Sequence, residues 1–215
     1  MRPVVKICGL TRKEDALMCA RYGADILGFV VEYPHPVPWN LDIRSAKELI
    51  AAAPAQAKTC AVTGGPPDKI LRIAAEAQPG YIQLHCGETL ADTARLVDEL
   101  GRRGVKIIKT IFPDTPELEK TAADFCAAGV YALLFDPRTP ADAARGGAAD
   151  IAVFDRLRRA VDCPVILAGG ITPENAAETV RKSGTRIIDL MTGVESRPGV
   201  KDETKVRALF RALDM

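Results

Sequence analysis

Residues 4–11 read Val-Val-Lys-Ile-Cys-Gly-Leu-Thr, a short run rich in β-branched residues that ends at Cys8. The run predicts a β-strand with Val5 and Ile7 in a core, and Thr11 can cap a helix that follows. Cys8 then falls where the strand leaves the core, the end from which α/β barrels project their reacting groups. Its position alone also fits a small buried apolar residue, the usual state of a free cysteine.

The same alternation of strand and helix continues along the chain. We predict strands at Val4–Ile7, Ile26–Val31, Ala57–Val62, Tyr81–Leu84, Lys106–Ile111, Val130–Phe135, Val165–Ala168 and Arg186–Leu190. We predict helices at Lys13–Tyr22, Ile43–Ala53, Asp68–Ala77, Thr89–Leu100, Pro116–Cys126, Ile151–Ala160, Pro173–Lys182 and Glu203–Leu213. Eight such units in 215 residues predict a parallel sheet closed into a single-domain (β/α)8 TIM barrel over residues 1–215. An open doubly wound sheet is the alternative, but the Gly-x-Gly-x-x-Gly turn typical of that fold is missing.

Composition narrows the possible partners. The 29 basic and 28 acidic residues form no long run of one sign, so we expect neither nucleic acid nor a membrane as a partner. No apolar run approaches the roughly 18 residues of a spanning helix, and we expect a cytoplasmic location. The six cysteines show no Cys-x-x-Cys spacing and there are only two histidines, so we expect no metal site. Disulfides are not expected in a cytosolic chain of this size.

Glycines at the ends of the last two predicted strands indicate a phosphate site. Gly169 and Gly170 end the seventh strand, and Thr192 and Gly193 follow the eighth. Barrels usually bind phosphate at these two loops, where backbone N–H groups point at the anion and glycine allows a close approach. A tight turn is the alternative explanation for the Gly-Gly pair.

Cys8 and Asp136 end the first and sixth predicted strands, so a barrel places them at one mouth. A thiol and a carboxyl that do not touch suit a proton shuttle, in which one group removes a proton and the other delivers one. As an acid, Asp136 needs a pKa raised by burial; otherwise it is an N-cap or turn residue before Pro137. Asp189 and His85 form a further set, in which Asp189 suits a substrate hydroxyl or amine, and His85 fits a solvated strand end equally well.

Four motifs resemble phosphoribosylanthranilate isomerases of tryptophan biosynthesis, in the same order over the whole chain. They are Lys6-Ile7-Cys8-Gly9-Leu10-Thr11, Gln83-Leu84-His85, the run from Leu167 to Asn175, and the run from Gly193 to Asp202. The resemblance implies a (β/α)8 barrel and an Amadori rearrangement without a cofactor, an aldose–ketose isomerisation. It implies that Cys8 is the general base and Asp136 the general acid. It also carries phosphate contacts onto Gly170 and Gly193, with Thr192 in place of the usual serine, and a substrate contact onto Asp189.

The loop after the second strand departs from that family. The family usually reads Ser-Pro-Arg there, and the arginine holds the anthranilate carboxylate; we align His35-Pro36-Val37 with it. Valine cannot replace a bidentate arginine–carboxylate contact. Candidates for a replacement contact are Arg138, Arg12, and the side chains of His35 and Asn40. Trp39, in the same loop, either faces the substrate or packs the loop.

Three functions remain open from the sequence. The first is the isomerase itself, the second is the same barrel acting on a different sugar or aminosugar phosphate, and the third is a non-catalytic barrel that binds a sugar phosphate. Cys8 and Asp136 together favour an enzyme, because a binding module needs neither. In each case the expected partner is a small-molecule sugar phosphate, and the chain is expected to be a monomer or a homodimer.

Overall fold

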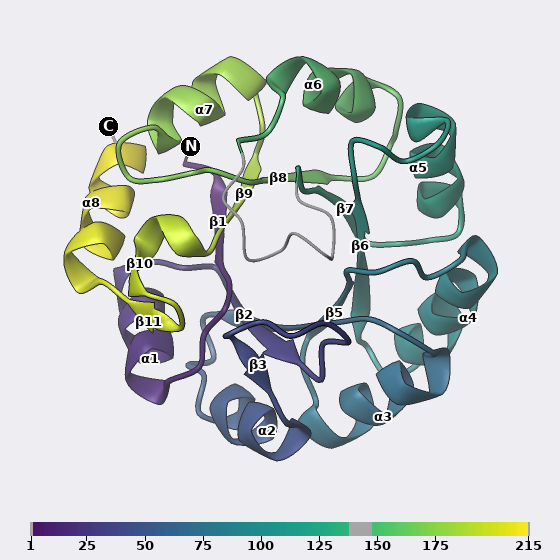
Figure 1. The fold of residues 1–215 in the computed structure, drawn as a ribbon, viewed down its shortest axis with the longest axis horizontal. Coiled ribbons are helices and arrows are strands. Elements are labelled where there is room, and N and C mark those ends of the chain that lie inside the picture. The colour runs from purple at the N-terminus through teal and green to yellow at the C-terminus, as the bar shows by residue number, and fades with distance from the viewer. Residues whose placement is uncertain (1, 138–147, 215) are drawn as a thin grey trace.

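The computed structural model describes residues 2–137 and 148–214. In these stretches eight parallel strands form a closed ring surrounded by eight helices (Figure 1). The strands of the ring are β1 (Val4–Ile7), β2 (Ile26–Val31), β4 (Lys58–Thr63), β5 (Tyr81–Leu84), β6 (Lys106–Ile111), β7 (Ala132–Phe135), β8 (Val165–Ala168) and β9 (Ile187–Leu190). The helices are α1 (Lys13–Tyr22), α2 (Ile43–Ala51), α3 (Pro67–Ala77), α4 (Leu90–Gly101), α5 (Leu118–Ala127), α6 (Ile151–Arg159), α7 (Ala176–Ser183) and α8 (Glu203–Leu213). The predicted TIM barrel is confirmed.

The ring closes because β1 pairs in parallel with both of its neighbours. Lys6 lies opposite Ile26 of β2 on one side and opposite Asp189 of β9 on the other. A short strand β3 (Asn40–Leu41) pairs with the carboxyl end of β2. After β9 the chain makes a 3-10 turn, η2 (Thr192–Val194), and a two-stranded hairpin of β10 (Glu195–Arg197) and β11 (Val200–Lys201).

The strands are apolar on both faces because each face is covered. Successive side chains of a strand point to opposite faces. One set packs between the sheet and the helices, for example Val5, Ile7 and Leu27. The alternate set, for example Ile108, Leu134 and Ile166, fills the interior of the barrel. Two covered faces explain why the strands appear in the sequence as continuous apolar runs.

Helix α7 begins later than the predicted Pro173, at Ala176. Asn175 forms a turn before it: its Oδ1 accepts from the Thr172 amide at 2.8 Å, and its Nδ2 donates to the Gly170 carbonyl at 2.9 Å. Such side-chain bonds offer the backbone an alternative to the helix. The turn fixes the loop in which the phosphate site is expected.

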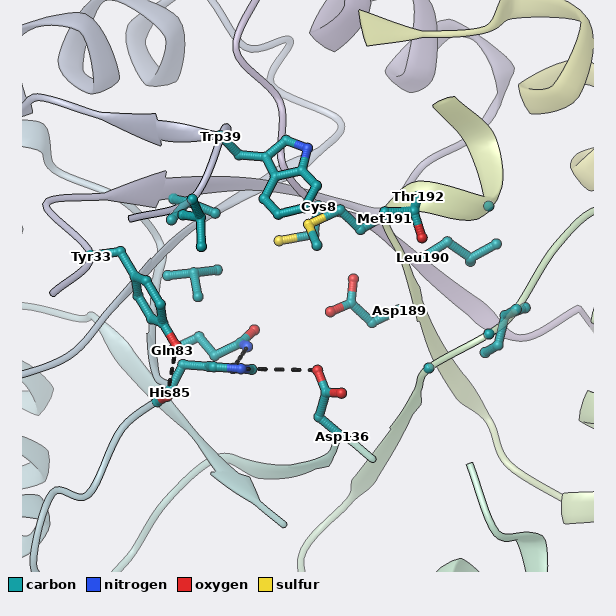
Figure 2. Close-up of a pocket in the computed structure, with 17 residues that line it drawn as sticks. Cys8, Tyr33, Trp39, Gln83, His85, Asp136, Asp189, Leu190, Met191 and Thr192 are labelled. Atoms are coloured by element: carbon teal, nitrogen blue, oxygen red, sulfur yellow. Dashed lines mark hydrogen bonds and ion pairs between the residues drawn. The ribbon is translucent and has the colours of Figure 1, made fainter. Parts of the chain in front are cut away.

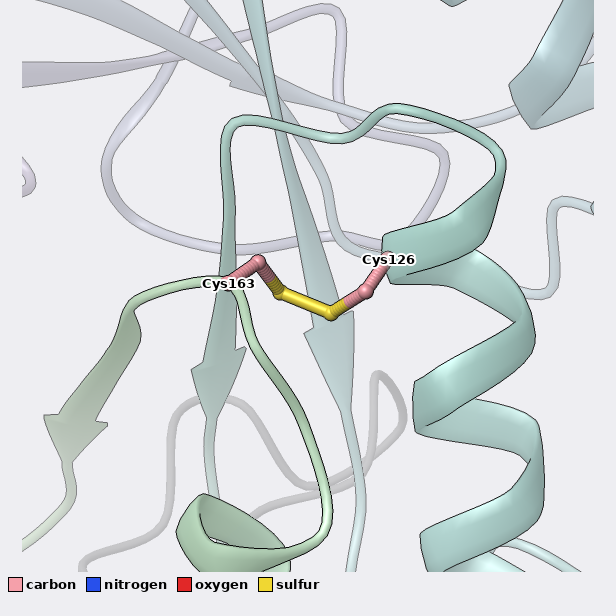
Figure 3. Close-up of a disulfide and its surroundings, with 2 residues drawn as sticks. All are labelled: Cys126 and Cys163. Carbon is pink, nitrogen blue, oxygen red and sulfur yellow. A yellow bond between two sulfur atoms is a disulfide. The ribbon is translucent and has the colours of Figure 1, made fainter.

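The expectation that no disulfide forms is wrong. Cys126 at the end of α5 is bonded to Cys163 in the segment before β8, with Cα atoms 5.8 Å apart (Figure 3). The two cysteines are 37 residues apart in the sequence, so their spacing gives no local signal. They meet because β7 and β8 are neighbours, and the segments that lead into neighbouring parallel strands lie at the same end of a barrel.

A membrane-spanning helix is not found among residues 2–137 and 148–214, since none of the helices there is long and apolar enough.

Candidate active site

The carboxyl ends of the barrel strands surround one pocket (Figure 2). It contains about 630 Å³ of space not filled by atoms, part of it open to solvent. The lining includes eight of the nine predicted site residues: Cys8, His85, Asp136, Gly169, Gly170, Asp189, Thr192 and Gly193. The ninth, Arg138, lies outside the described residues.

Cys8 is placed at the pocket by strand pairing. It follows β1, its amide donates to the Leu190 carbonyl at 2.8 Å, and it is only 5% exposed. Gly28 of β2 leaves room for the thiol, because a Cβ there would lie 2.8 Å from Sγ. Burial raises the pKa of Cys8, and the charge of Lys6 opposes that effect without cancelling it. The resting side chain at neutral pH is therefore the thiol.

Lys6 and Asp189 form an ion pair beneath the pocket. Their strands pair at these two residues, and Lys6 Nζ donates to Asp189 Oδ2 at 2.7 Å. The Lys6 side chain is fully buried. Burial alone would lower the pKa of Lys6, but the Asp189 carboxylate, with smaller effects of Cys8 and Cys60, holds it above its ordinary value. The pair fixes Asp189 at the pocket wall as an anion.

His85 contacts Asp136, whereas the sequence had grouped it with Asp189. Its Nε2 lies 3.9 Å from Asp136 Oδ2, and its Nδ1 lies 3.1 Å from Gln83 Nε2 and 3.0 Å from Thr110 Oγ1. His85 is 7% exposed, so it is not the solvated strand-end residue considered above, and Asp136 is 2% exposed. In Figure 2, Cys8 and Asp136 lie on different sides of the pocket, with Asp189 between them.

The two glycine loops meet at one side of the pocket. Gly169 and Gly170 have φ values of 96° and 65°, in the left-handed region that only glycine adopts easily. Gly193 packs against the first loop so closely that a Cβ would lie 2.0 Å from the Ile171 carbonyl oxygen. These loops bring backbone groups to the pocket without side chains in the way, which is what a phosphate group needs.

Of the aromatic wall of the pocket, the sequence offered only Trp39, which either faces the substrate or packs the loop. Trp39 is 2% exposed, lines the pocket, and donates from Nε1 to Glu195 Oε1 at 2.9 Å. Tyr33 packs edge-on against His85 and donates to its carbonyl. Gln83, also missed as a site residue, lines the pocket because it points inward from β5. An inward-facing polar residue in a predicted strand was the available signal.

Three of the four candidates for a contact with the anthranilate carboxylate lie among the described residues, and none of the three lines the pocket. Arg12 is exposed and pairs with Glu14, and Asn40 bonds to the backbone of Tyr33. His35 is not in the pocket lining, although its ring lies 5.8 Å from that of Tyr33. Among the described lining residues there is neither an arginine nor a lysine.

A metal-binding group is not found among the described residues, where no three His, Cys, Asp or Glu side chains gather in a suitable arrangement. Beside the two glycine loops, the described residues offer a thiol, carboxyl groups and an imidazole, the groups used in acid–base chemistry.

Comparisons with known proteins agree with this arrangement. Residues 5–212 match the family model described as "N-(5'phosphoribosyl)anthranilate (PRA) isomerase". An N-(5'-phosphoribosyl)anthranilate isomerase of Haloferax volcanii is 38% identical over 97% of this chain and 91% of its own. A phosphoribosyl anthranilate isomerase structure from Thermus thermophilus matches with a TM-score of 0.83 and 33% identity, covering 98% of each chain. One from Thermotoga maritima matches with a TM-score of 0.84 and 26% identity, over 99% of this chain and 98% of its own.

Proposed function

The chain belongs to the N-(5'-phosphoribosyl)anthranilate isomerase family, and we propose that it isomerises this substrate with Asp136 as general acid and Cys8 as general base. The reaction is an intramolecular oxidoreduction of the aldose–ketose type in tryptophan biosynthesis. The observation that supports these roles most directly is that Cys8 and Asp136 both line one pocket beside the two glycine loops.

Asp136 acts first in this mechanism. Its proton passes to the furanose ring oxygen, the bond from that oxygen to C1′ breaks, and the nitrogen lone pair forms an iminium with C1′. The burial of Asp136 at the pocket wall and its contact with His85 support this role.

Cys8 acts second, as a thiolate whose proton has first passed to water. It removes the proton from C2′, and the electron pair of that bond neutralises the iminium to give an enolamine. The enolamine then loses the proton of its 2′-hydroxyl and gains one at C1′, which yields the ketone. Lys6 supports the base because its positive charge lowers the free energy of the thiolate.

Substrate binding is shared between the two ends of the pocket. We assign the phosphate to Gly169, Gly170, Thr192 and Gly193, and a ribose hydroxyl to Asp189. His85, next to Asp136, contributes to the sugar side of the site. The aromatic amine then lies towards Trp39 and Tyr33, the apolar part of the wall. Arg138 stays the candidate for the anthranilate carboxylate.

The expected partner is thus a small-molecule sugar phosphate, bound without a cofactor. We infer a cytoplasmic location from the biosynthetic role of the family. We expect the chain to act as a monomer or a homodimer.

Turnover of N-(5'-phosphoribosyl)anthranilate by the purified protein tests this proposal, with Cys8→Ala and Asp136→Asn as variants. General acid or base catalysis contributes about 10²- to 10⁴-fold, so each variant should lose that much in kcat. The fluorescence of the aromatic amine follows the reaction. Parent-like rates in Cys8→Ala would show that the base is wrongly assigned. No turnover by the parent protein, with inorganic phosphate still bound, would leave the two other functions considered from the sequence.

A further inference from the structure

Two polar groups determine which nitrogen of His85 carries hydrogen. The Nδ1 atom lies 3.1 Å from Gln83 Nε2 and 3.0 Å from Thr110 Oγ1. An amide nitrogen can only donate, so Nδ1 accepts, and a neutral ring then carries its hydrogen on Nε2. That nitrogen faces Asp136 Oδ2 at 3.9 Å (Figure 2).

We propose that Gln83 and Thr110 fix His85 in the Nε2–H tautomer, and that His85 thereby positions Asp136 and stabilises the carboxylate that forms when Asp136 gives up its proton. The inference rests on the proposed role of Asp136 as the acid. His85 is a positioning residue in this scheme because it acts through Asp136.

The contact between His85 Nε2 and Asp136 Oδ2 is loose in this structure. The distance of 3.9 Å is longer than a hydrogen bond. Hydrogen bonds in catalytic sites often tighten when substrate binds, and this one strengthens as negative charge develops on Asp136.

The same network leaves one acceptor for the substrate. Gln83 lines the pocket, is 2% exposed, and its Oε1 has no hydrogen-bond partner among the described residues. A buried acceptor without a donor is unfavourable, so a substrate hydroxyl or N–H that donates to Oε1 is favoured there. Such a donor also holds the Gln83 amide in the orientation that keeps its Nε2 atom next to Nδ1 of His85. Substrate binding and the tautomer of His85 are coupled in this way.

Among the described residues, the titratable groups that face the pair are held by partners of their own or stay neutral. Tyr33, after β2, donates to the His85 carbonyl, and burial raises its pKa, so it stays neutral. Lys109 of β6 is bonded to Glu88 at 2.8 Å, and Asp189 of β9 is bonded to Lys6. Across the pocket, burial keeps Cys8 of β1 in the thiol form until it acts.

The tautomer can be measured directly. The chain has only two histidines, so the ¹⁵N spectrum of histidine-labelled protein assigns His85 by comparison with a His35→Gln variant. We expect the Nε2–H form for His85 at neutral pH. Gln83→Glu, which replaces the donor with an acceptor of similar size, should shift His85 to the Nδ1–H form or the imidazolium. An Nδ1–H form in the unmodified protein would overturn the proposal.

Kinetics of His85→Leu and His85→Gln test the effect on the acid. A hydrogen bond to a charged group is worth enough that His85→Leu should lower kcat about 10- to 100-fold, with KM changed less than about threefold. Losing a donor disfavours the Asp136 carboxylate, so the limb of the pH–rate profile that Asp136→Asn abolishes should move to higher pH. His85→Gln keeps an N–H near Asp136 and should restore most of the rate. A loss confined to KM, or no recovery in His85→Gln, contradicts the proposal.

A double-mutant cycle separates this inference from the assignment of the acid. If His85 acts through Asp136, adding His85→Leu to Asp136→Asn should lower kcat less than about twofold further. Fully additive losses overturn the role of His85 while Asp136 stays the acid. A parent-like kcat in Asp136→Asn removes Asp136 as the acid, and with it the proposal for His85.

Discussion

The two ends of the barrel are held together by different means. At the carboxyl end of the strands, three nearly buried ion pairs surround the pocket region: Lys6–Asp189 at 2.7 Å, Lys109–Glu88 at 2.8 Å and Lys201–Glu195 at 2.7 Å. At the opposite end, the Cys126–Cys163 disulfide joins the end of α5 to the segment before β8. The Arg2–Asp25 ion pair at the same end is about one-third exposed.

The two ends differ because the carboxyl end carries the residues of the pocket, whereas the contacts at the opposite end serve only stability. Buried charges lose their hydration, so a buried ion pair adds little stability even when its geometry is good. Such pairs are kept at the carboxyl end because they fix the positions and charges of groups such as Asp189. A disulfide at the other end restricts the unfolded chain without placing charge near the pocket. Four variants test this contrast between the two ends of the barrel.

Lys6→Met should have the largest effect on stability. It leaves the Asp189 carboxylate without its 2.7 Å partner in a buried site, which typically costs about 3–5 kcal/mol. Chemical denaturation measures the free energy of unfolding. The matched control is Lys6→Met with Asp189→Asn, which should recover much of the loss because no buried charge is left. A loss below about 1 kcal/mol in the single variant would contradict the contrast.

The same Lys6→Met variant changes the acidity of Cys8. Burial already holds the pKa of this thiol above its ordinary value, and removing the positive charge should raise it further. The thiolate fraction at a given pH should therefore fall in Lys6→Met. Absorbance at 240 nm, with Cys8→Ser as the baseline, follows this titration. A midpoint that moves to lower pH would show that Lys6 does not act on Cys8.

Replacing both Cys126 and Cys163 with serine should cost almost as much stability and leave kcat unchanged. The bond closes a loop of 37 residues, for which chain entropy predicts about 4 kcal/mol. Thiol counting under denaturing conditions should find four free cysteines in the unmodified protein, namely Cys8, Cys19, Cys60 and Cys86. Six free thiols, or a fall in kcat that matches the fall in stability, would remove the contrast between the two ends.

Trp39→Phe should have a smaller effect. It removes one hydrogen bond to Glu195, which keeps its 2.7 Å contact with Lys201, so the cost should be about 1–2 kcal/mol. Circular dichroism follows unfolding in this variant because Trp39 is the single tryptophan of the chain. In the unmodified protein, a bound substrate analogue should change Trp39 fluorescence, and no change on binding would place Trp39 outside the occupied site.

Arg2→Ala, at the opposite end, should have the smallest effect. Arg2 is bonded to Asp25 at 2.8 Å, but both side chains are about one-third exposed and solvent screens their attraction. The expected loss is about 1 kcal/mol or less, with kcat unchanged. A loss as large as that of Lys6→Met would mean that burial does not distinguish the two pairs.

The barrel could be predicted from the pattern of apolar and polar residues along the chain. Apolar runs covered on both faces marked the strands, and β5, β6 and β8 begin and end where predicted. Helix starts were less accurate where a polar side chain bonds to the backbone, as Asn175 does before α7. Because parallel strands point the same way, the residues that end them could be expected at one mouth before any coordinates were known.

What the sequence determined by itself is therefore the barrel and the set of residues at its mouth, since both follow from periodicity along the chain. Tertiary structure alone decided the pairings: Cys126 with Cys163, His85 with Asp136, and Lys6 with Asp189. Partners in such pairs are 37 to 183 residues apart, so no local spacing records them. They meet only because closing the ring sets neighbouring strands in a fixed register, which places each side chain against groups from distant parts of the chain.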